Sequence, residues 1–317
     1  MMTRSHREHR PFTLVLGGGG ARGFVHVGVL KALEHMGYHP AAIVGVSMGG
    51  VVGATYALRP DDWYEALLSF DTTGLPVPAR SKKGRTALRD RLHDLFFQAR
   101  ALFDVAVGWG PGERSLEAGL DMLERLMGSK DLRDGRIPVA VSATDLISGD
   151  RVVIRSGSAV QATYASSALA GVLHPMRRGA ELLADGAYSD IAPIDIAREV
   201  ENAVVIAVDP GRLGEPGPIR TGLQAALRAV EVCYTHHSHL RFSLADFVLR
   251  PVFPRDIDTF DFGERRTCVA TGIRLVREQR DQIEALLGGR PTLEALAGND
   301  DSKHSPCLRA FDGRPAS

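Results

Sequence analysis

A serine stands between two glycines in the segment Gly45-Val46-Ser47-Met48-Gly49 of this 317-residue chain. In a G-x-S-x-G segment the glycines relieve crowding at a tight turn between a strand and a helix, and the turn exposes the serine hydroxyl as a nucleophile. A serine that attacks an ester also needs a base for its proton and donors for the oxyanion. The segment therefore predicts a nucleophile, Ser47, whose partners must lie elsewhere in the chain.

A glycine run precedes this segment and suits the donor role. Backbone N–H groups that carry no bulky side chains can hold the negative charge that develops on the oxygen of an attacked ester. We expect the oxyanion loop in Gly18, Gly19, Gly20, Ala21, Arg22 and Gly23. The guanidinium of Arg22 either orients the amides of this loop, attracts an anionic head group, or simply solvates the start of a helix.

The base is expected at Asp185, which follows an apolar, strand-like run and precedes Gly186 and Ala187. Functional sites of α/β proteins collect at the carboxyl ends of parallel strands, and this aspartate is expected there. Burial raises the pKa of a carboxyl group above its ordinary value of ~3.9, which makes the group a better base. Taken alone, the segment is more typical of a plain Asp-Gly turn after a strand.

These residues need a scaffold in which strands alternate with helices. Apolar runs predict strands at 12–16, 41–46, 137–143, 151–155, 181–184 and 203–208. Helical spacing of apolar residues predicts helices over 24–36, 49–58, 220–249 and 268–287. This order predicts an α/β fold with a mainly parallel central sheet covered by helices on both faces, and with extra helices in the C-terminal third.

Three regions are expected along the chain, which is 44% apolar and can bury a sizeable core. Residues 10–210 are predicted to form the α/β domain that carries these motifs, and 211–297 a helical extension packed on it. Residues 298–317 are rich in Asp, Ser, Pro and Arg and are predicted to be a disordered tail.

An amphipathic stretch is predicted between Arg85 and Trp109. Its apolar residues recur at helical spacing and are interleaved with arginines: Leu88, Leu92, Leu95, Phe96, Leu102 and Phe103. An ordinary helix packed on the sheet is the more typical interpretation of such a stripe. The alternative is a helix that covers the acyl pocket or lies at a lipid interface.

Composition excludes several other classes of protein. The chain has 38 basic and 38 acidic residues, so no net field favours a nucleic-acid partner. Its three cysteines match no metal or redox spacing, which is typical of reduced thiols in the cytoplasm. No apolar run approaches the ~20 residues of a membrane span, and the run 12–16 is too short for a signal-peptide core. We expect no metal and no other cofactor, and a cytoplasmic enzyme with at most weak peripheral contact at the inner membrane face.

A nucleotide-binding site is the first alternative, because Gly18, Gly20 and Gly23 satisfy G-x-G-x-x-G between a strand and a helix. A dinucleotide site also needs an acidic residue at the end of the second strand. That strand ends instead in Gly45-Val46-Ser47 without an Asp or Glu. A P-loop is excluded more simply, because no Gly-Lys-Ser/Thr follows the glycines.

A Ser-His-Asp triad of the ordinary α/β-hydrolase type is the second alternative. That fold places its serine after several strands, whereas Ser47 follows the second predicted strand. The late histidines are His236, His237, His239 and His304. The first three fall in a helical stretch where solvated histidines are common, and the last falls in the expected tail. His26, on the first predicted helix, would project near the site, although a lone helical histidine is more often structural.

The glycine run, the G-x-S-x-G segment and Asp185-Gly186-Ala187, in that order, resemble the patatin-like phospholipase family. The surroundings of the glycine run look like its bacterial branch, which also resembles the catalytic domain of neuropathy target esterase. The resemblance spans about residues 10 to 210 and implies a Ser47-Asp185 dyad. One departure concerns Asp190, which occupies a stretch where the family usually carries an asparagine shortly before a proline.

The resemblance implies a serine acyl hydrolase, a phospholipase, lipase or esterase, that acts on a lipid or another acyl ester. The alternative from another class is a catalytically weak regulatory or acyl-sensing protein that retains the pocket. The altered residue at Asp190 and the weakly matching C-terminal third are the features that favour this alternative.

Overall fold

The computed structural model describes residues 9–72, 115–170, 172–211, 219 and 222–288. The predicted amphipathic stretch 85–109 and the predicted tail 298–317, with His304, lie outside these residues. In the part of the chain that is described, no helix is long and apolar enough to cross a membrane.

A mixed sheet forms the centre of the fold and has eight strands within the described residues. They are β1 (Phe12–Leu16), β2 (Ala42–Val46), β3 (Val139–Asp145), β4 (Arg151–Ile154), β5 (Met176–Arg178), β6 (Glu181–Asp185), β7 (Val204–Val208) and β8 (Phe247–Leu249). Their order is β5-β6-β3-β2-β1-β7-β8, and β4 also pairs with β3. The pairs from β3 to β8 along this order are parallel, whereas β4 and β6 run antiparallel to β3. The predicted mainly parallel sheet is confirmed.

The central strands are mostly apolar because helices cover both of their faces. All residues of β1, β2 and β7 are buried. The register pairs Leu16 of β1 with Gly45 of β2 and with Val208 of β7. The carboxyl ends of these three strands therefore meet at one edge of the sheet, where the glycine run and Ser47 begin.

Nine α-helices lie within the described residues. They are α1 (Val25–His35), α2 (Met48–Leu58), α3 (Trp63–Leu68), α5 (Ser115–Met127), α6 (Ala159–Ser167), α7 (Ile194–Ala197), α8 (Gly222–Phe242), α9 (Arg265–Glu278) and α10 (Arg280–Leu287). Strand side chains alternate between faces. Leu14 and Leu16 of β1 join one buried cluster with α1, α2, α5, α6 and α9, whereas Val15 joins a second with α7 and Phe242 of α8. The expected cover on both faces is confirmed.

The C-terminal third differs from the prediction in two places. The helix predicted over 220–249 ends at Phe242, and Phe247–Leu249 instead form β8 beside β7. The helix predicted over 268–287 is divided at Gln279 into α9 and α10. A strand of three residues is too short to show alternation, so periodicity could not distinguish β8 from a helix end. The segment beyond residue 210 thus contributes to the sheet as well as to its helical cover.

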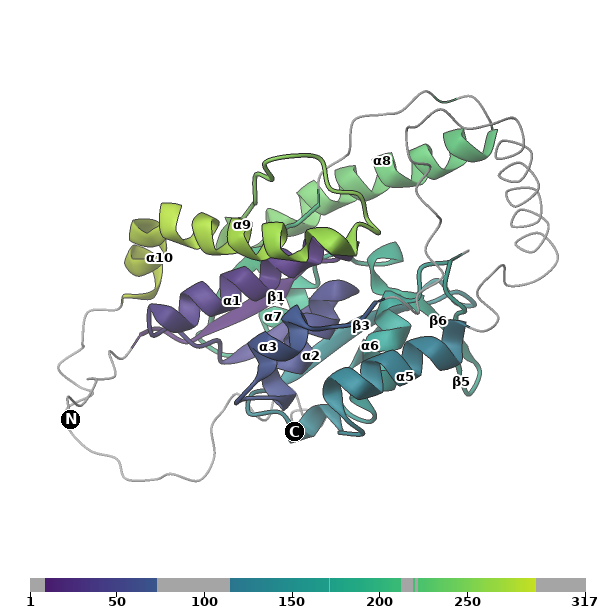
Figure 1. Ribbon diagram of the computed structural model, residues 1–317, viewed down its shortest axis with the longest axis horizontal. Helices are drawn as coiled ribbons and strands as arrows, with labels where there is room; N and C mark the ends of the chain where they lie inside the picture. Colours follow the sequence, from purple (N-terminus) through teal and green to yellow (C-terminus); the bar gives the residue numbers. More distant parts are fainter. Residues whose placement is uncertain (1–8, 73–114, 171, 212–218, 220–221, 289–317) are drawn as a thin grey trace.

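Helices α1 and α9 lie side by side (Figure 1) and approach each other at two glycines. A Cβ atom at Gly28 would overlap the backbone carbonyl of Val269, and one at Gly272 would overlap that of Val25. The Cβ position of Gly272 lies 3.1 Å from the Cα atom of Gly28. The two helices therefore pack backbone to backbone, which anchors α9 on the helix that follows the glycine run.

Candidate active site

Ser47 occupies a strained turn between β2 and α2. Its backbone has φ 54° and ψ −127°, a region that non-glycine residues rarely adopt. The motif glycines allow this turn to be tight: a Cβ atom at Gly45 would lie 2.5 Å from Gly50 Cα, and one at Gly49 would overlap the carbonyl of Leu16. The turn therefore has the sharp geometry that the exposure of a serine nucleophile requires.

A buried serine on α6 holds the turn in place. The amide of Ser47 donates to Ser166 Oγ at 2.8 Å, and this hydroxyl donates in turn to the carbonyl of Ser142 at 2.6 Å. These two hydrogen bonds connect α6 and β3 to the turn, and the first of them satisfies the Ser47 amide, which would otherwise lack a partner. Sequence reasoning assigned no role to Ser166, because no spacing pattern relates it to Ser47.

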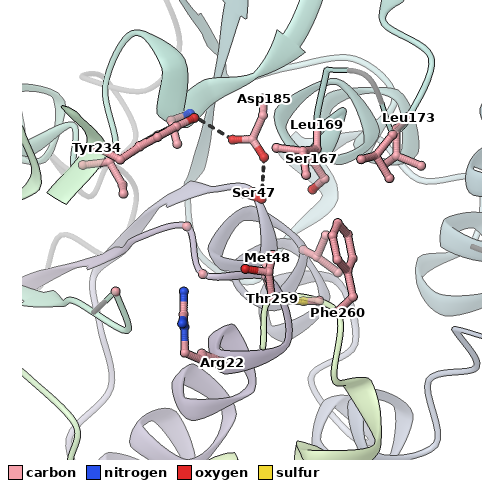
Figure 2. A pocket seen from close by; sticks show the side chains of 18 of the residues that line it. Arg22, Ser47, Met48, Ser167, Leu169, Leu173, Asp185, Tyr234, Thr259 and Phe260 are labelled. Carbon is pink, nitrogen blue, oxygen red and sulfur yellow. Dashed lines mark hydrogen bonds between the residues drawn. The ribbon is translucent and has the colours of Figure 1, made fainter. Parts of the chain in front are cut away.

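Asp185 lies at the end of β6 and accepts a hydrogen bond from Ser47. The distance from Ser47 Oγ to Asp185 Oδ2 is 2.8 Å (Figure 2). The other carboxylate oxygen, Oδ1, accepts from the amide of Ala187 at 2.9 Å, so the Asp-Gly-Ala segment orients its own aspartate. Thr144 Oγ1 donates to the Asp185 carbonyl at 2.9 Å and holds the backbone of this segment.

The strand register brings this pair together in a way that the sequence did not predict. Asp185 does lie at the carboxyl edge of the parallel strands, but its own strand β6 runs antiparallel to β3, a direction that the sequence did not indicate. Asp185 stands opposite Ala143, and the preceding residue of β3, Ser142, stands opposite Val46. Ser47 and Asp185 therefore flank the same point of β3 from its two sides.

Burial changes the acidity of Asp185. Its side chain is within the core, with 6% of the residue exposed. Loss of water around the carboxylate raises the pKa of Asp185 to about 6, against the opposing effect of the hydrogen bonds from Ala187 and Ser47. A carboxylate with this pKa is ionised at neutral pH and is a far better proton acceptor than an exposed aspartate.

The glycine run forms a loop beside Ser47. The amides of Gly17 and Ala21 donate to the carbonyls of Val208 and Thr259, at 3.1 and 2.7 Å. Between them, the amides of Gly18, Gly19 and Gly20 have no acceptor among the described residues. A Cβ atom at Gly18 would lie 3.3 Å from Ser47 Cβ, so the loop passes directly beside the serine.

Gly20 and Arg22 determine how this loop turns into the following helix. Gly20 has φ +55°, and a Cβ atom there would overlap the carbonyl of Thr259, so glycine is required. Arg22 donates from Nη1 to the carbonyl of Ile257 at 3.3 Å and lines the cavity beside the loop (Figure 2). This contact joins the loop to the segment that precedes α9.

A cavity of about 530 Å³ opens over Ser47 and Asp185. Apolar side chains line much of it: Val51, Met122, Leu123, Leu169, Leu173 and Phe260. In Figure 2 the last three lie on one side of Ser47, and Tyr234 lies on the other. Polar and charged residues also line it: Arg22, Asp209, Ser238 and His239. The cavity can thus contact both an apolar chain and a polar group.

The late histidines do not take the position of a base. The acceptor of the Ser47 hydroxyl is Asp185, and His236 and His239 have exposed side chains on α8. His239 does line the cavity. Among the described residues no three His, Cys, Asp or Glu side chains gather as a metal site would require.

Ion pairs of Asp190, the residue that departs from the family pattern, hold the loop behind Asp185. Asp190 is buried and accepts from Arg241 at 2.9 and 2.6 Å and from Arg151 at 2.6 Å. It also accepts from the amide of Ala192 at 3.1 Å, within its own loop. The extra negative charge is therefore matched by two arginines, which connect the loop to α8 and β4.

Comparison with known proteins places this chain in a family. The model of the patatin-like phospholipase family matches residues 14–198. An NTE family protein of Mycobacterium tuberculosis is 31% identical over 70% of this chain and 57% of its own length. Lysophospholipase NTE1 of Yarrowia lipolytica is 29% identical over 66% of this chain and 13% of its own length. This chain thus spans only part of the length of these relatives.

Among solved structures, VipD from Legionella pneumophila aligns over 86% of this chain and 67% of its own, with a TM-score of 0.46 and 15% identity. The matched region of the family model contains the glycine run, Ser47 and Asp185, which line the cavity. Because this match covers more than half of the sequence, the chain belongs to the patatin-like phospholipase family.

Proposed function

We propose that this chain is a serine acyl hydrolase that cleaves carboxylic ester bonds of lipids with Ser47 and Asp185. The observation that carries the proposal is the 2.8 Å hydrogen bond from Ser47 Oγ to a buried carboxylate at the base of a largely apolar cavity. Membership of the patatin-like phospholipase family and the lysophospholipase names of two relatives support a lipid ester as the substrate.

The proposed reaction has two halves. Asp185 accepts the proton of Ser47 as the serine oxygen attacks the ester carbonyl, and the amides of the glycine loop hold the resulting oxyanion. The carbon–oxygen bond to the leaving alcohol then breaks, the alcohol takes the proton from Asp185, and an acyl-serine remains. Asp185 next accepts a proton from water as the water oxygen attacks the acyl-serine. The bond from the acyl carbon to Ser47 Oγ then breaks, Oγ takes the proton back from Asp185, and the fatty acid is released.

The cavity supports a substrate with one long apolar chain near the ester. The apolar wall formed by Leu169, Leu173 and Phe260 suits the acyl chain, and the polar wall near Arg22 suits the head group. Weak peripheral contact with a membrane is part of the proposal, because the substrate is a lipid. The segment 85–109, for which contact with a lipid interface is the alternative to ordinary packing, lies outside the described residues.

Labelling by a fluorophosphonate tests the proposal directly. We expect the reagent to modify Ser47 in the wild-type protein, and p-nitrophenyl esters to be hydrolysed with a preference that depends on acyl length. The oxyanion is held by fixed backbone dipoles, so EDTA should not reduce the rate on a soluble ester. Mass spectrometry identifies the labelled residue, and Ser47→Ala is the blank.

Two results would contradict this proposal. Loss of hydrolysis on chelation, restored by a metal ion, would mean that the oxyanion is held in another way. Tight binding of fatty-acyl probes without labelling or turnover would instead favour the acyl-sensing alternative.

The pH dependence of hydrolysis follows from the state of Asp185. The carboxyl must be ionised to accept a proton, and burial raises the pKa of Asp185 to about 6. We therefore expect kcat/KM to rise with pH through about 6 and to reach a plateau at neutral pH. The measurement is a kcat/KM profile on a soluble short-chain ester between about pH 4.5 and 8.5. A profile that is flat down to pH 5 would show that a more acidic group is the base.

A further inference from the structure

His26 lies in the first turn of α1, directly behind the glycine loop. Its side chain is completely buried, and its Nε2 atom lies 2.8 Å from the carbonyl oxygen of Gly17. The other ring nitrogen, Nδ1, is buried and has no partner among the described residues. The proposed mechanism makes no use of this histidine.

The surroundings of the ring determine where its proton lies. Burial lowers the pKa of His26 to about 4, so the ring is neutral near neutral pH and carries a single N–H. A proton on Nδ1 would leave the Nε2 lone pair facing a carbonyl oxygen at 2.8 Å, which is repulsive. The tautomer with Nε2–H instead donates a hydrogen bond to Gly17, and the unpartnered Nδ1 then has no proton to satisfy.

That hydrogen bond orients a peptide group of the oxyanion loop. In a trans peptide the C=O of one residue and the N–H of the next point in opposite directions. A Gly17 carbonyl held toward α1 therefore directs the Gly18 amide away from α1. Gly18 lies beside Ser47, and its amide has no protein acceptor among the described residues.

Without the hydrogen bond from His26, little would hold the peptide group between Gly17 and Gly18 in one orientation. Glycine is permissive in both φ and ψ, so a peptide between two glycines can rotate more easily than any other. The amide of Gly17 is fixed by the Val208 carbonyl at 3.1 Å, but this bond leaves the following peptide free to turn. Within the described residues, the hydrogen bond from His26 is the one that reaches the Gly17 carbonyl.

We infer that His26 is a positioning residue of the oxyanion loop: its Nε2–H holds the Gly17 carbonyl and thereby directs the Gly18 amide at the oxygen that becomes negative during ester cleavage. The inference rests on the proposed hydrolase function. His26 itself does not touch the substrate.

Two amide substitutions of His26 test this role as a matched pair. The amide nitrogen of His26→Gln can occupy the position of Nε2, whereas that of His26→Asn reaches only the position of Nδ1. We expect His26→Gln to keep most of the wild-type kcat. We expect His26→Asn to lose on the order of 10²-fold in kcat with little change in KM, because misplacing a catalytic group by about 1 Å costs that much.

Stability is measured on the same proteins to separate positioning from packing. Val29→Ala is the control, because Val29 is fully buried on the same helix, three residues further from the loop than His26. It should lower the melting temperature without a comparable loss of kcat. Equal losses of kcat in the Gln and Asn variants, or no loss in either, would overturn the inference.

The wild-type protein separates failure of this inference from failure of the proposed function. If wild type is not labelled at Ser47 and does not turn over esters, the function is wrong and the loop has no oxyanion to hold. If wild type is active and His26→Asn matches it, only the inference falls. If neither variant folds, ¹⁵N NMR of wild type decides: protonation at Nε2 supports the inference, and a proton on Nδ1 overturns it.

Discussion

Replacement of Ser47 by alanine should abolish ester hydrolysis, and replacement of Asp185 by asparagine should do nearly the same. Each variant is expected to lose on the order of 10⁴-fold or more in kcat/KM, because a nucleophile and its base act as one unit. The double variant should be hardly worse than either single one. The measurement is kcat/KM on a soluble p-nitrophenyl ester for the three variants beside wild type.

The asparagine variant also has an internal control for folding. Its amide can still accept from Ala187 and donate to Ser47, in the places of the two carboxylate oxygens. The pKa of Asp185 in the folded protein, about 6, lies above the ordinary value of 3.8, so the folded state binds the proton more tightly than the unfolded state. Ionisation of Asp185 therefore lowers the free energy of unfolding as the pH rises from about 4 to 6. The loss amounts to about 3 kcal/mol once the pH is above both pKa values.

Asp185→Asn lacks this penalty and should melt at or above the temperature of wild type at pH 7.5, with the difference vanishing near pH 4. An inactive variant that is also less stable at pH 7.5 would mean that activity was lost through the fold. Near-normal turnover in Asp185→Asn would contradict the dyad. A triad through His239, which lines the same cavity, would then be tested by mutation.

Gly28→Ala should cause the largest loss of stability outside the site. A Cβ atom there would overlap the backbone carbonyl of Val269 and lie 2.9 Å from the amide of Ile273. Backbone of a packed helix cannot rotate away as a side chain can, so α1 and α9 must move apart. We expect overpacking to lower the free energy of unfolding by about 1 to 3 kcal/mol. The better helix propensity of alanine should offset up to about 1 kcal/mol of that loss.

Thermal unfolding of Gly28→Ala measures this effect, and Gly272→Ala should behave alike because the overlap is reciprocal. The control is Gly263→Ala, where the nearest atom to the new Cβ lies 3.8 Å away, at an ordinary contact distance. Its melting temperature should stay close to that of wild type. An unchanged melting temperature in Gly28→Ala would show that α9 is not docked on α1 as described.

The sequence alone was sufficient for most of the strands and for several of the residues that meet at the cavity. Apolar runs marked six of the eight strands found among the described residues, because a strand buried on both faces is largely apolar. The elbow around Ser47 and the glycine loop were also predictable. Each depends on backbone geometry within a few residues, and glycine at those positions is a local requirement.

Only the tertiary structure showed how these residues are held. The antiparallel register of β6, which brings Asp185 to Ser47, depends on pairing with β3, and no local pattern specifies that direction. The hydrogen bond between Ser166 and the elbow and the one between His26 and the loop join residues on different elements. The close packing of α1 against α9 also joins elements that are distant in the sequence.

The ion pairs around Asp190 also show which features the sequence predicts and which only the tertiary structure reveals. Its position after the Asp-Gly-Ala segment was visible in the sequence as a departure from the family pattern. Its partners Arg151 and Arg241 lie on β4 and α8, far from it along the chain. Spacing along a chain specifies what neighbouring residues can do, because local backbone geometry has a fixed period. Contacts between distant residues are selected by the packing of whole elements, and that selection exists only in the folded protein.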